Sequence, residues 1–219
     1  PVPENPFELT REEAKVIGTE NDETDTIWLG YYNEPRLIYT APAFKKGPWK
    51  ASNRRTVHIA IDVFANKGTK LYAPMEGEVF TAEYRDSPLD YGGVVILKHT
   101  TPDNDEFFTL YGHLDPQFLD ALQVGDKIDK GQEFCKLGGP DVNGGWAPHV
   151  HFQIAMTTDG MEADWPGVAD PDDLNFWNSV CPNPASMLNL EDHDCAYNFN
   201  KKTEVLSDRK KYFGGNLSV

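Results

Sequence analysis

Histidines and one aspartate recur in three short strings whose residue types suit metal binding and proton transfer. His58 and Asp62 stand in TVHIAIDVF, His113 stands in LYGHL, and His149 and His151 stand in APHVHFQI. Imidazole nitrogens and carboxylate oxygens are ordinary ligands of Zn²⁺. A free imidazole has a pKa of about 6.5, which suits proton transfer near neutral pH. These residues are therefore the candidates for chemistry.

Strand periodicity gives this spacing a geometric meaning. Side chains at alternate positions of a strand share a face, so His58, Ala60 and Asp62 are expected to project together. Val57, Ile59, Ile61 and Val63 would point the other way into a core. The same rule places His149 and His151 on one face, with Val150 and Phe152 opposite. Two imidazoles and a carboxylate from neighbouring strands can then converge.

Two imidazole nitrogens and one carboxylate oxygen suit Zn²⁺ and leave a fourth position open, as in a catalytic site. Taken alone, His58 and Asp62 could be a solvated polar pair on one face of a helix. His149 and His151 alone could be histidines without a function on an exposed strand. The apolar flanks of both strings indicate buried strands instead. There an unsatisfied polar group costs about 1–3 kcal/mol, so the joint pattern favours a metal site.

The elements that must position these residues are predicted to be mainly β-strands. From Ile27 onward, short runs rich in β-branched and aromatic residues alternate with turns rich in Gly, Pro, Asn and Asp. Such closely spaced runs predict a small, mainly antiparallel β-sheet or sandwich domain. PQFLDALQ is expected to be a short helical insert, and His99 in ILKHTT is expected to be exposed.

Three parts are expected along the chain. Residues 1–26 hold a capped helical fragment and an acidic linker, residues 27–160 the β domain, and residues 161–219 a helical appendage and linker that leads to a possible next domain. In the last part, Asp170 is predicted to cap a helix with Pro171 at its first position. The chain starts at Pro1 without a methionine, so we expect a piece of a longer protein.

Composition limits the classes of partner. There are 35 acidic and 20 basic residues in 219, a formal charge of −15, so nucleic acid and anionic membranes are unfavourable partners. No run approaches the roughly 18 apolar residues that a membrane helix needs. Three cysteines, Cys135, Cys181 and Cys195, favour a reducing compartment, although a bridge between Cys181 and Cys195 stays open.

The strings HIAID, NKGTKLYAPMEGEV, YGHL, VGDKIDKGQEFCKLG and PHVHFQI, in this order, resemble the lysostaphin-type or LytM-type zinc metallopeptidases, which cut peptide bonds of bacterial peptidoglycan. The resemblance covers roughly residues 50–156. It implies that His58, Asp62 and His151 are the zinc ligands and that His149 is the base for water. It also implies that His113 stabilises the oxyanion or shuttles a proton, and that the zinc lies in a groove across a small antiparallel β domain.

Two departures from the family pattern bear on catalysis. Ala60 replaces the usual glycine between the first two ligands. This change is expected to have a small effect, because a methyl group can fit beneath the metal. A tyrosine often precedes the first ligand in the family, but PWKASNRRTV has none. Either Trp49, Arg54 or Arg55 replaces it, or catalysis is weaker than in the family.

A second, shorter resemblance concerns context. IWLGYYNEPRLIYTAPAF and DRKKYFGGNLSV look like the version of this domain embedded in large cytoplasmic proteins, between a kinase-like module and an aminotransferase module. It implies a cytoplasmic location; a periplasmic or secreted one is the alternative if a missing N-terminus held a signal peptide.

The sequence thus predicts a zinc-dependent hydrolase of a peptide, peptidoglycan-like or small amide substrate. The alternative is a non-cleaving zinc-binding or scaffold module of a larger metabolic enzyme. Trp146, Trp165 and Trp177 either wall a groove or fill cores.

Overall fold

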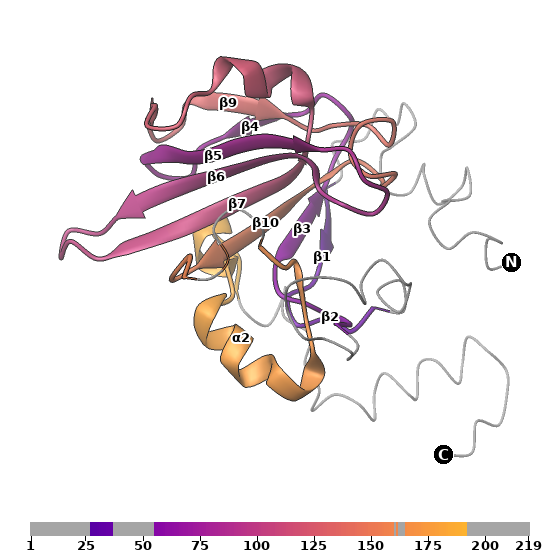
Figure 1. The fold of residues 1–219 in the computed structure, drawn as a ribbon, viewed down its shortest axis with the longest axis vertical. Coiled ribbons are helices and arrows are strands. Elements are labelled where there is room, and N and C mark those ends of the chain that lie inside the picture. The colour runs from indigo at the N-terminus through magenta and orange to yellow at the C-terminus, as the bar shows by residue number, and fades with distance from the viewer. Residues whose placement is uncertain (1–26, 37–54, 160, 162–164, 192–219) are drawn as a thin grey trace, which may run out of the picture.

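A computed structural model describes residues 27–36, 55–159, 161 and 165–191 of the chain (Figure 1). Most of the regular structure in these residues is β-strand, as the sequence predicts. The strands are β1 (Trp28–Gly30), β2 (Val57–His58), β3 (Ile61–Phe64), β4 (Lys70–Tyr72), β5 (Gly77–Arg85), β6 (Gly92–Thr100), β7 (Glu106–Leu114), β8 (Lys127–Ile128), β9 (Glu133–Lys136), β10 (His149–Ala155) and β11 (Val168–Ala169).

A seven-stranded antiparallel sheet organises the fold, in the order β1-β3-β10-β7-β6-β5-β8. Two small antiparallel pairs, β11 with β2 and β4 with β9, accompany it. The chemistry-bearing strings lie on strands that are neighbours in the main sheet, because β10 pairs with β3 on one side and with β7 on the other. The register places His151 opposite both Asp62 and Gly112.

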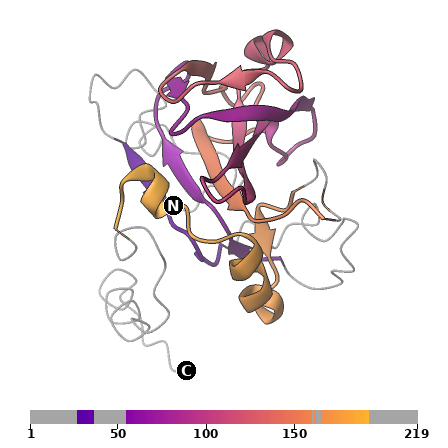
Figure 2. The same cartoon turned by 90° about the vertical axis from the view of Figure 1, so that its left-hand side faces the viewer.

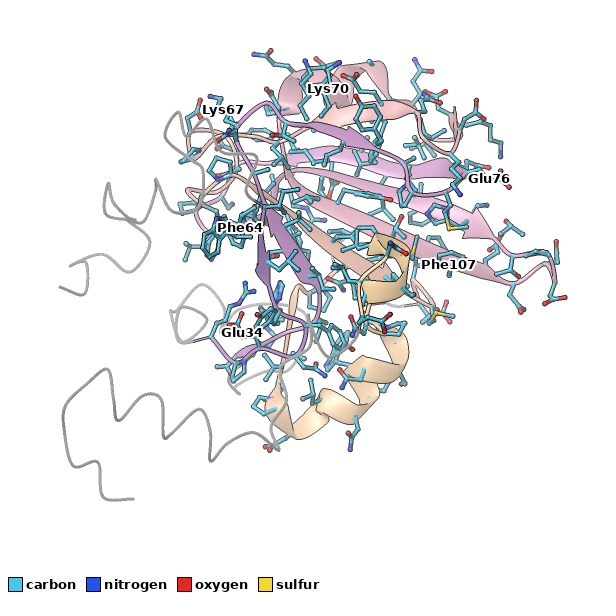
Figure 3. All side chains as sticks on the ribbon, turned by 180° about the vertical axis from the view of Figure 1, so that it is seen from behind. Glu34, Phe64, Lys67, Lys70, Glu76 and Phe107 are labelled. Carbon is cyan, nitrogen blue, oxygen red and sulfur yellow. The ribbon has the colours of Figure 1, made fainter. Side chains whose placement is uncertain are left out.

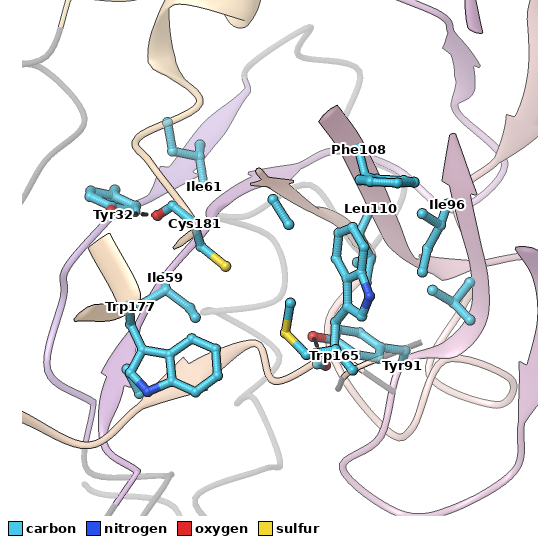
Figure 4. Close-up of a cluster of buried hydrophobic side chains, with 14 of the residues drawn as sticks. Tyr32, Ile59, Ile61, Tyr91, Ile96, Phe108, Leu110, Trp165, Trp177 and Cys181 are labelled. Carbon is cyan, nitrogen blue, oxygen red and sulfur yellow. Dashed lines mark hydrogen bonds between the residues drawn. The ribbon is translucent and has the colours of Figure 1, made fainter. Parts of the chain in front are cut away.

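The fold contains two clusters of buried hydrophobic side chains. One joins sheet residues such as Ile96 and Leu110 to Trp165, Trp177 and Cys181 of the C-terminal segment (Figure 4). The other includes Phe134 and Cys135 of β9 and Val150 and Phe152 of β10. Figure 2 shows β4 and β9 on the opposite side of the sheet from α2. Because Trp165 and Trp177 belong to the first cluster, these two side chains fill a core.

The described helices are short. A 3₁₀ helix at Pro116–Ala121 matches the expected insert, and the Asp115 side chain caps it by accepting from the Gln117 amide. Another at Pro171–Asp173 is capped in the same way by Asp170 and leads into α2 (Leu174–Val180). A last one covers Ala185–Leu188. The helix expected within residues 1–26 lies outside the described residues, as do Cys195 and the tail 208–219.

None of the helices in the described part of the chain is long and apolar enough to cross a membrane.

One local expectation differs from the structure. His58 and Asp62 do not share one continuous strand, because the chain bends at Ile59 and Ala60 between β2 and β3. His58 pairs with Val168 of β11, whereas Asp62 pairs with His151 and Gly30 in the main sheet. The bend still brings the two side chains together, for a different reason than strand periodicity.

His99 was expected at the surface but is buried, with 1% of its area exposed. Its ring stacks on Phe107, and its nitrogens hydrogen-bond to the carbonyl of Glu76 and the hydroxyl of Thr109. Thr109 belongs to β7, the strand beside β6, so this pairing depends on the sheet and not on neighbours in the sequence.

Candidate metal centre

Three side-chain atoms from β2, β3 and β10 converge in the interior. His58 Nε2 lies 3.1 Å from His151 Nδ1 and 3.1 Å from Asp62 Oδ1, and His151 Nδ1 lies 3.3 Å from Asp62 Oδ1. All three residues are buried. The three atoms form a nearly equilateral triangle.

The outer nitrogens of the two imidazoles fix which atoms carry protons. His58 Nδ1 donates to the carbonyl oxygen of Tyr31 at 3.0 Å, because that oxygen can only accept. His151 Nε2 donates to Gln153 Oε1 at 2.9 Å. The nitrogens that face each other therefore present lone pairs, and they meet a carboxylate oxygen that has no hydrogen-bond partner among the described residues.

Three acceptors in van der Waals contact require a cation between or beside them, since lone pairs repel one another. A tetrahedral ion with bonds of ~2.0–2.1 Å would hold its donor atoms roughly 3.3 Å apart, close to the sides of this triangle. Two nitrogens and one carboxylate oxygen suit Zn²⁺. The residues present thus fit a zinc ion, which His58, Asp62 and His151 would hold.

Gln153 orients the His151 ring. Its side-chain amide nitrogen donates to the carbonyl of Pro166 at 3.2 Å and to Cys181 Sγ at 3.2 Å, so its oxygen must face His151. Gln153 has no exposed area. A ring held in this way keeps Nδ1 directed at the centre.

Asp62 is held by its second oxygen. Arg36 Nη1 donates to Asp62 Oδ2 at 2.6 Å, and Arg36 Nε donates to Glu34 Oε2 at 2.8 Å (Glu34 is labelled in Figure 3). Asp62 thus uses Oδ2 for the arginine and leaves Oδ1 for the two imidazoles.

His149 lies beside the triangle on the same strand as His151. Its Nε2 is 3.7 Å from Asp62 Oδ1, and its Nδ1 donates to the carbonyl of Ala147 at 2.6 Å. The ring stacks on Phe64, which Figure 3 labels on β3. His149 therefore presents an unprotonated Nε2 next to the ligands.

His113 reaches the site through an unusual backbone conformation, a left-handed φ of 65° at the end of β7. Its backbone amide donates to the Tyr91 carbonyl, and its carbonyl accepts from Gly138. The side-chain Nδ1 donates to the Asn143 carbonyl at 3.0 Å, which leaves Nε2 unprotonated. The ring centroid lies 4.2 Å from that of His149, so the two imidazoles are neighbours.

Two aromatic rings pack around these histidines. Tyr91 contacts the rings of His113 and His151, at centroid distances of 5.7 and 5.2 Å, and its hydroxyl donates to the Trp165 carbonyl. The ring centroid of Trp146 lies 5.9 Å from that of His113 and 6.5 Å from that of His149. Trp146 therefore belongs to the surroundings of the site, unlike Trp165 and Trp177.

Burial governs the protonation of these groups. Burial lowers the pKa of His58 to about 4, and Arg36 acts in the same direction. It also lowers the pKa of His149, and it holds the pKa of His113 well below its usual value. Burial opposes ionisation of Asp62, but His58, Arg36, His149 and His151 together outweigh it and keep the pKa of this carboxyl well below its usual value. The site therefore offers neutral imidazoles at His58, His113 and His149 and an anionic carboxylate at Asp62, and neutral imidazole and carboxylate are the forms that bind metal.

All of the predicted site residues meet in the structure: His58, Asp62, His113, His149 and His151. Sequence reasoning missed Tyr31, Arg36 and Gln153. Gln153 alone carried a signal, because it stands two residues after His151 on the same face. Of the candidates to replace the missing tyrosine, Trp49 and Arg54 lie outside the described residues. The arginine that contacts Asp62 is Arg36, which was not among those candidates.

Comparison with known protein families gives one match, over the part of the chain that carries the proposed site. Residues 56–163 match the sequence model of peptidase family M23. A search of curated protein sequences found no significant match.

Solved structures similar to this chain include two bacterial peptidases and a prophage-encoded M23 protein. The catalytic domain of lysostaphin from Staphylococcus simulans is 22% identical, with a TM-score of 0.42, over 69% of this chain and 92% of that chain. A point mutant of the catalytic domain of the prophage-encoded M23 protein EnpA from Enterococcus faecalis is 19% identical, with a TM-score of 0.39, over 72% and 96%. A zinc-containing peptidase from Vibrio cholerae is 22% identical, with a TM-score of 0.37, over 57% and 36%. The chain thus spans 36% of the length of the Vibrio protein, and it spans 51% of lysostaphin in its solution structure.

Proposed function

Because residues 56–163 form a domain of peptidase family M23, we propose that this chain is a zinc-dependent hydrolase of the lysostaphin type that cleaves a peptide or amide bond. The observation that carries the proposal is the triangle of lone-pair atoms from His58, Asp62 and His151, with sides of 3.1, 3.1 and 3.3 Å. An arrangement of buried acceptors without donors between them is costly unless a cation joins them.

The number of ligands favours catalysis over a structural role. Structural zinc sites are usually closed by four protein ligands, whereas catalytic sites keep three and an open position. When bound, zinc would lower the pKa of a water molecule towards about 7 and polarise the substrate carbonyl.

The chain's own residues would move the protons. His149 is the base in this proposal, because its unprotonated Nε2 lies beside the ligands and its Nδ1 is fixed on the Ala147 carbonyl. His113 also presents an unprotonated Nε2, so it accepts a proton before it can donate a hydrogen bond to an oxyanion. His113 thus suits proton transfer first and oxyanion stabilisation once it is protonated.

The substrate class is proposed as a peptide, a peptidoglycan-like peptide or a small amide. A cytoplasmic setting beside kinase-like and aminotransferase modules remains a prediction of the sequence. In that setting a small amide becomes the favoured member of the class, because peptidoglycan strands lie outside the cytoplasm.

Metal analysis of two variants tests the proposal. The full chain, purified without chelators, should contain close to one zinc per chain, as a single three-ligand site predicts. His149→Ala should keep the zinc and lose hydrolysis, whereas Asp62→Ala should lose the zinc. Absence of zinc from the parent protein would contradict the proposal, and full hydrolysis by His149→Ala would show that the base is another residue.

A substrate panel completes the test. Glycyl peptides, peptidoglycan fragments and small amides should be incubated with the parent chain and with His149→Ala as the matched inactive protein. Release of a new amine only by the parent identifies the scissile bond. If no member of the panel is cleaved by a fully zinc-loaded chain, the proposed hydrolase activity is wrong.

A further inference from the structure

The segment 27–36 lies outside the family match, yet it contacts two of the three proposed ligands. The Tyr31 carbonyl accepts from His58 Nδ1 at 3.0 Å. Arg36 Nη1 donates to Asp62 Oδ2 at 2.6 Å. The third ligand, His151, is oriented from within the matched region, by Gln153 of its own strand.

Arg36 is itself held in place. Its side chain is 19% exposed, and Glu34 accepts from its Nε at 2.8 Å. The Asp62 side chain that it contacts is 2% exposed. A charge-assisted bond between groups this well shielded is stronger and more directional than one at the surface.

The contact decides which oxygen of Asp62 is available. Because Oδ2 accepts from the guanidinium, Oδ1 alone faces His58 Nε2 and His151 Nδ1, at 3.1 and 3.3 Å. A carboxylate whose second oxygen is bound elsewhere gives one oxygen to an ion instead of two. That leaves coordination positions for water and substrate.

Gly30 makes room for this arrangement. It is the register partner of Asp62 in the β1–β3 pair. A Cβ atom at this position would collide with Arg36 Nη2 and would lie 3.0 Å from Asp62 Oδ2. The guanidinium therefore reaches Asp62 across the bare backbone of Gly30.

We propose that residues 27–36 are a working part of the metal centre, and that Arg36 is a positioning residue that fixes Asp62 as a one-oxygen ligand. This inference rests on the proposed zinc site. It means that a segment outside the family domain orients His58 and Asp62.

If Arg36 acted only through its charge, its removal would change zinc affinity in the opposite direction. A positive charge near the ion repels it, so removal of that charge alone would strengthen zinc binding. Loss of a hydrogen-bonding partner of a ligand typically weakens metal affinity about 10- to 100-fold. The sign of the change in zinc affinity therefore separates positioning from charge.

The experiment measures zinc dissociation constants of the full chain by competition with a chromophoric chelator. Arg36→Met should bind zinc about 10- to 100-fold more weakly than the parent. The Co²⁺-substituted variant should show a changed visible absorption spectrum, since Asp62 is released to bind through both oxygens. Lys70→Met, which removes a positive charge from an exposed pair with Glu133, is the control and should leave both readouts unchanged.

Gly30→Ala tests the same contact without a change of charge. The new methyl group should displace the guanidinium, weaken zinc binding and change the Co²⁺ spectrum in the same way. In the Arg36→Met background it should add little, as expected for residues that act through one contact. This variant carries the test if Arg36→Met does not fold.

The outcomes separate the two proposals. A parent chain that binds no zinc contradicts the proposed function. A parent that binds zinc, together with Arg36→Met and Gly30→Ala variants that bind it equally or more tightly, overturns only the role of Arg36.

Discussion

Phe64 and His149 are register partners in the β3–β10 pair, and their rings stack with centroids 4.7 Å apart and an angle of 26° between their planes. The stack holds the imidazole of the proposed base against the strand that carries Asp62. A general base must lie within hydrogen-bond reach of the proton that it removes, so the orientation of this ring matters for rate.

Phe64→Leu should therefore slow hydrolysis without loss of zinc. We expect kcat to fall about 10- to 100-fold, because a misplaced base loses the geometry of the reacting complex. Kinetics and metal analysis of the same preparation check this. Phe107→Leu is the matched control, since Phe107 stacks on His99 with a similar angle of 27° outside the site, and it should leave kcat unchanged. Equal losses in both variants would contradict a specific role for Phe64.

Gln153→Leu should weaken zinc binding while the strand stays intact. The substitution removes the oxygen that accepts from His151 Nε2, so the ring and its tautomer are no longer fixed. We expect the zinc dissociation constant to rise about 10- to 100-fold. Gln132→Leu, which removes an amide that binds the Asp129 backbone in a surface turn, is the control. Unchanged zinc affinity in Gln153→Leu would show that the ring is held by packing alone.

His113 offers a pair of variants that separate catalysis from backbone conformation. His113→Ala and His113→Gly both remove the imidazole, and both should lose most of the activity. Because φ is 65°, alanine keeps an unfavourable left-handed conformation that glycine adopts freely. His113→Gly should therefore be more stable than His113→Ala by about 1 kcal/mol. Chemical denaturation checks this difference, and the reverse order would contradict the left-handed conformation.

The metal-free chain should lose stability as the pH falls. The pKa of His58 is about 4 in the folded protein and 6.5 in its ordinary state, so the unfolded chain binds the proton first. The contribution of His58 to the free energy of unfolding is then fully present above about pH 6.5 and is lost as the pH falls towards 4, by on the order of 3 kcal/mol. Urea denaturation at several pH values measures the decline. His58→Gln should flatten it, and an unchanged slope in that variant would assign the effect to other groups.

The sequence predicted a set of residues that the structure brings together, but only part of the geometry that joins them. The alternation in HVHFQI was a sound guide, because β10 is a regular strand and His149 and His151 do share a face. HIAID was predicted to follow the same rule. The structure instead bends the chain between His58 and Asp62, since His58 pairs with β11 and Asp62 with β10.

The partners that orient the ligands were out of reach of local patterns. Arg36 and Asp62 are 26 positions apart; they meet because β1 pairs with β3 and because the Arg36 amide donates to the Thr56 carbonyl beside β2. The buried position of His99 was missed for the same reason, since its partner Thr109 lies on the next strand. Strand pairing decides such contacts, and spacing within one strand carries no information about them.

The two segments that flank the family domain are joined to each other as well as to it. The Tyr32 hydroxyl donates to the Cys181 carbonyl at 2.7 Å, and Cys181 Sγ accepts from Gln153. A fragment cut at the limits of the family match would discard both segments together with the outer partners of His58 and Asp62. A recombinant piece for biochemistry should therefore include residues 27–36 and the segment through Cys181 together with the family match, and boundaries drawn from the family match alone would yield a weakened protein.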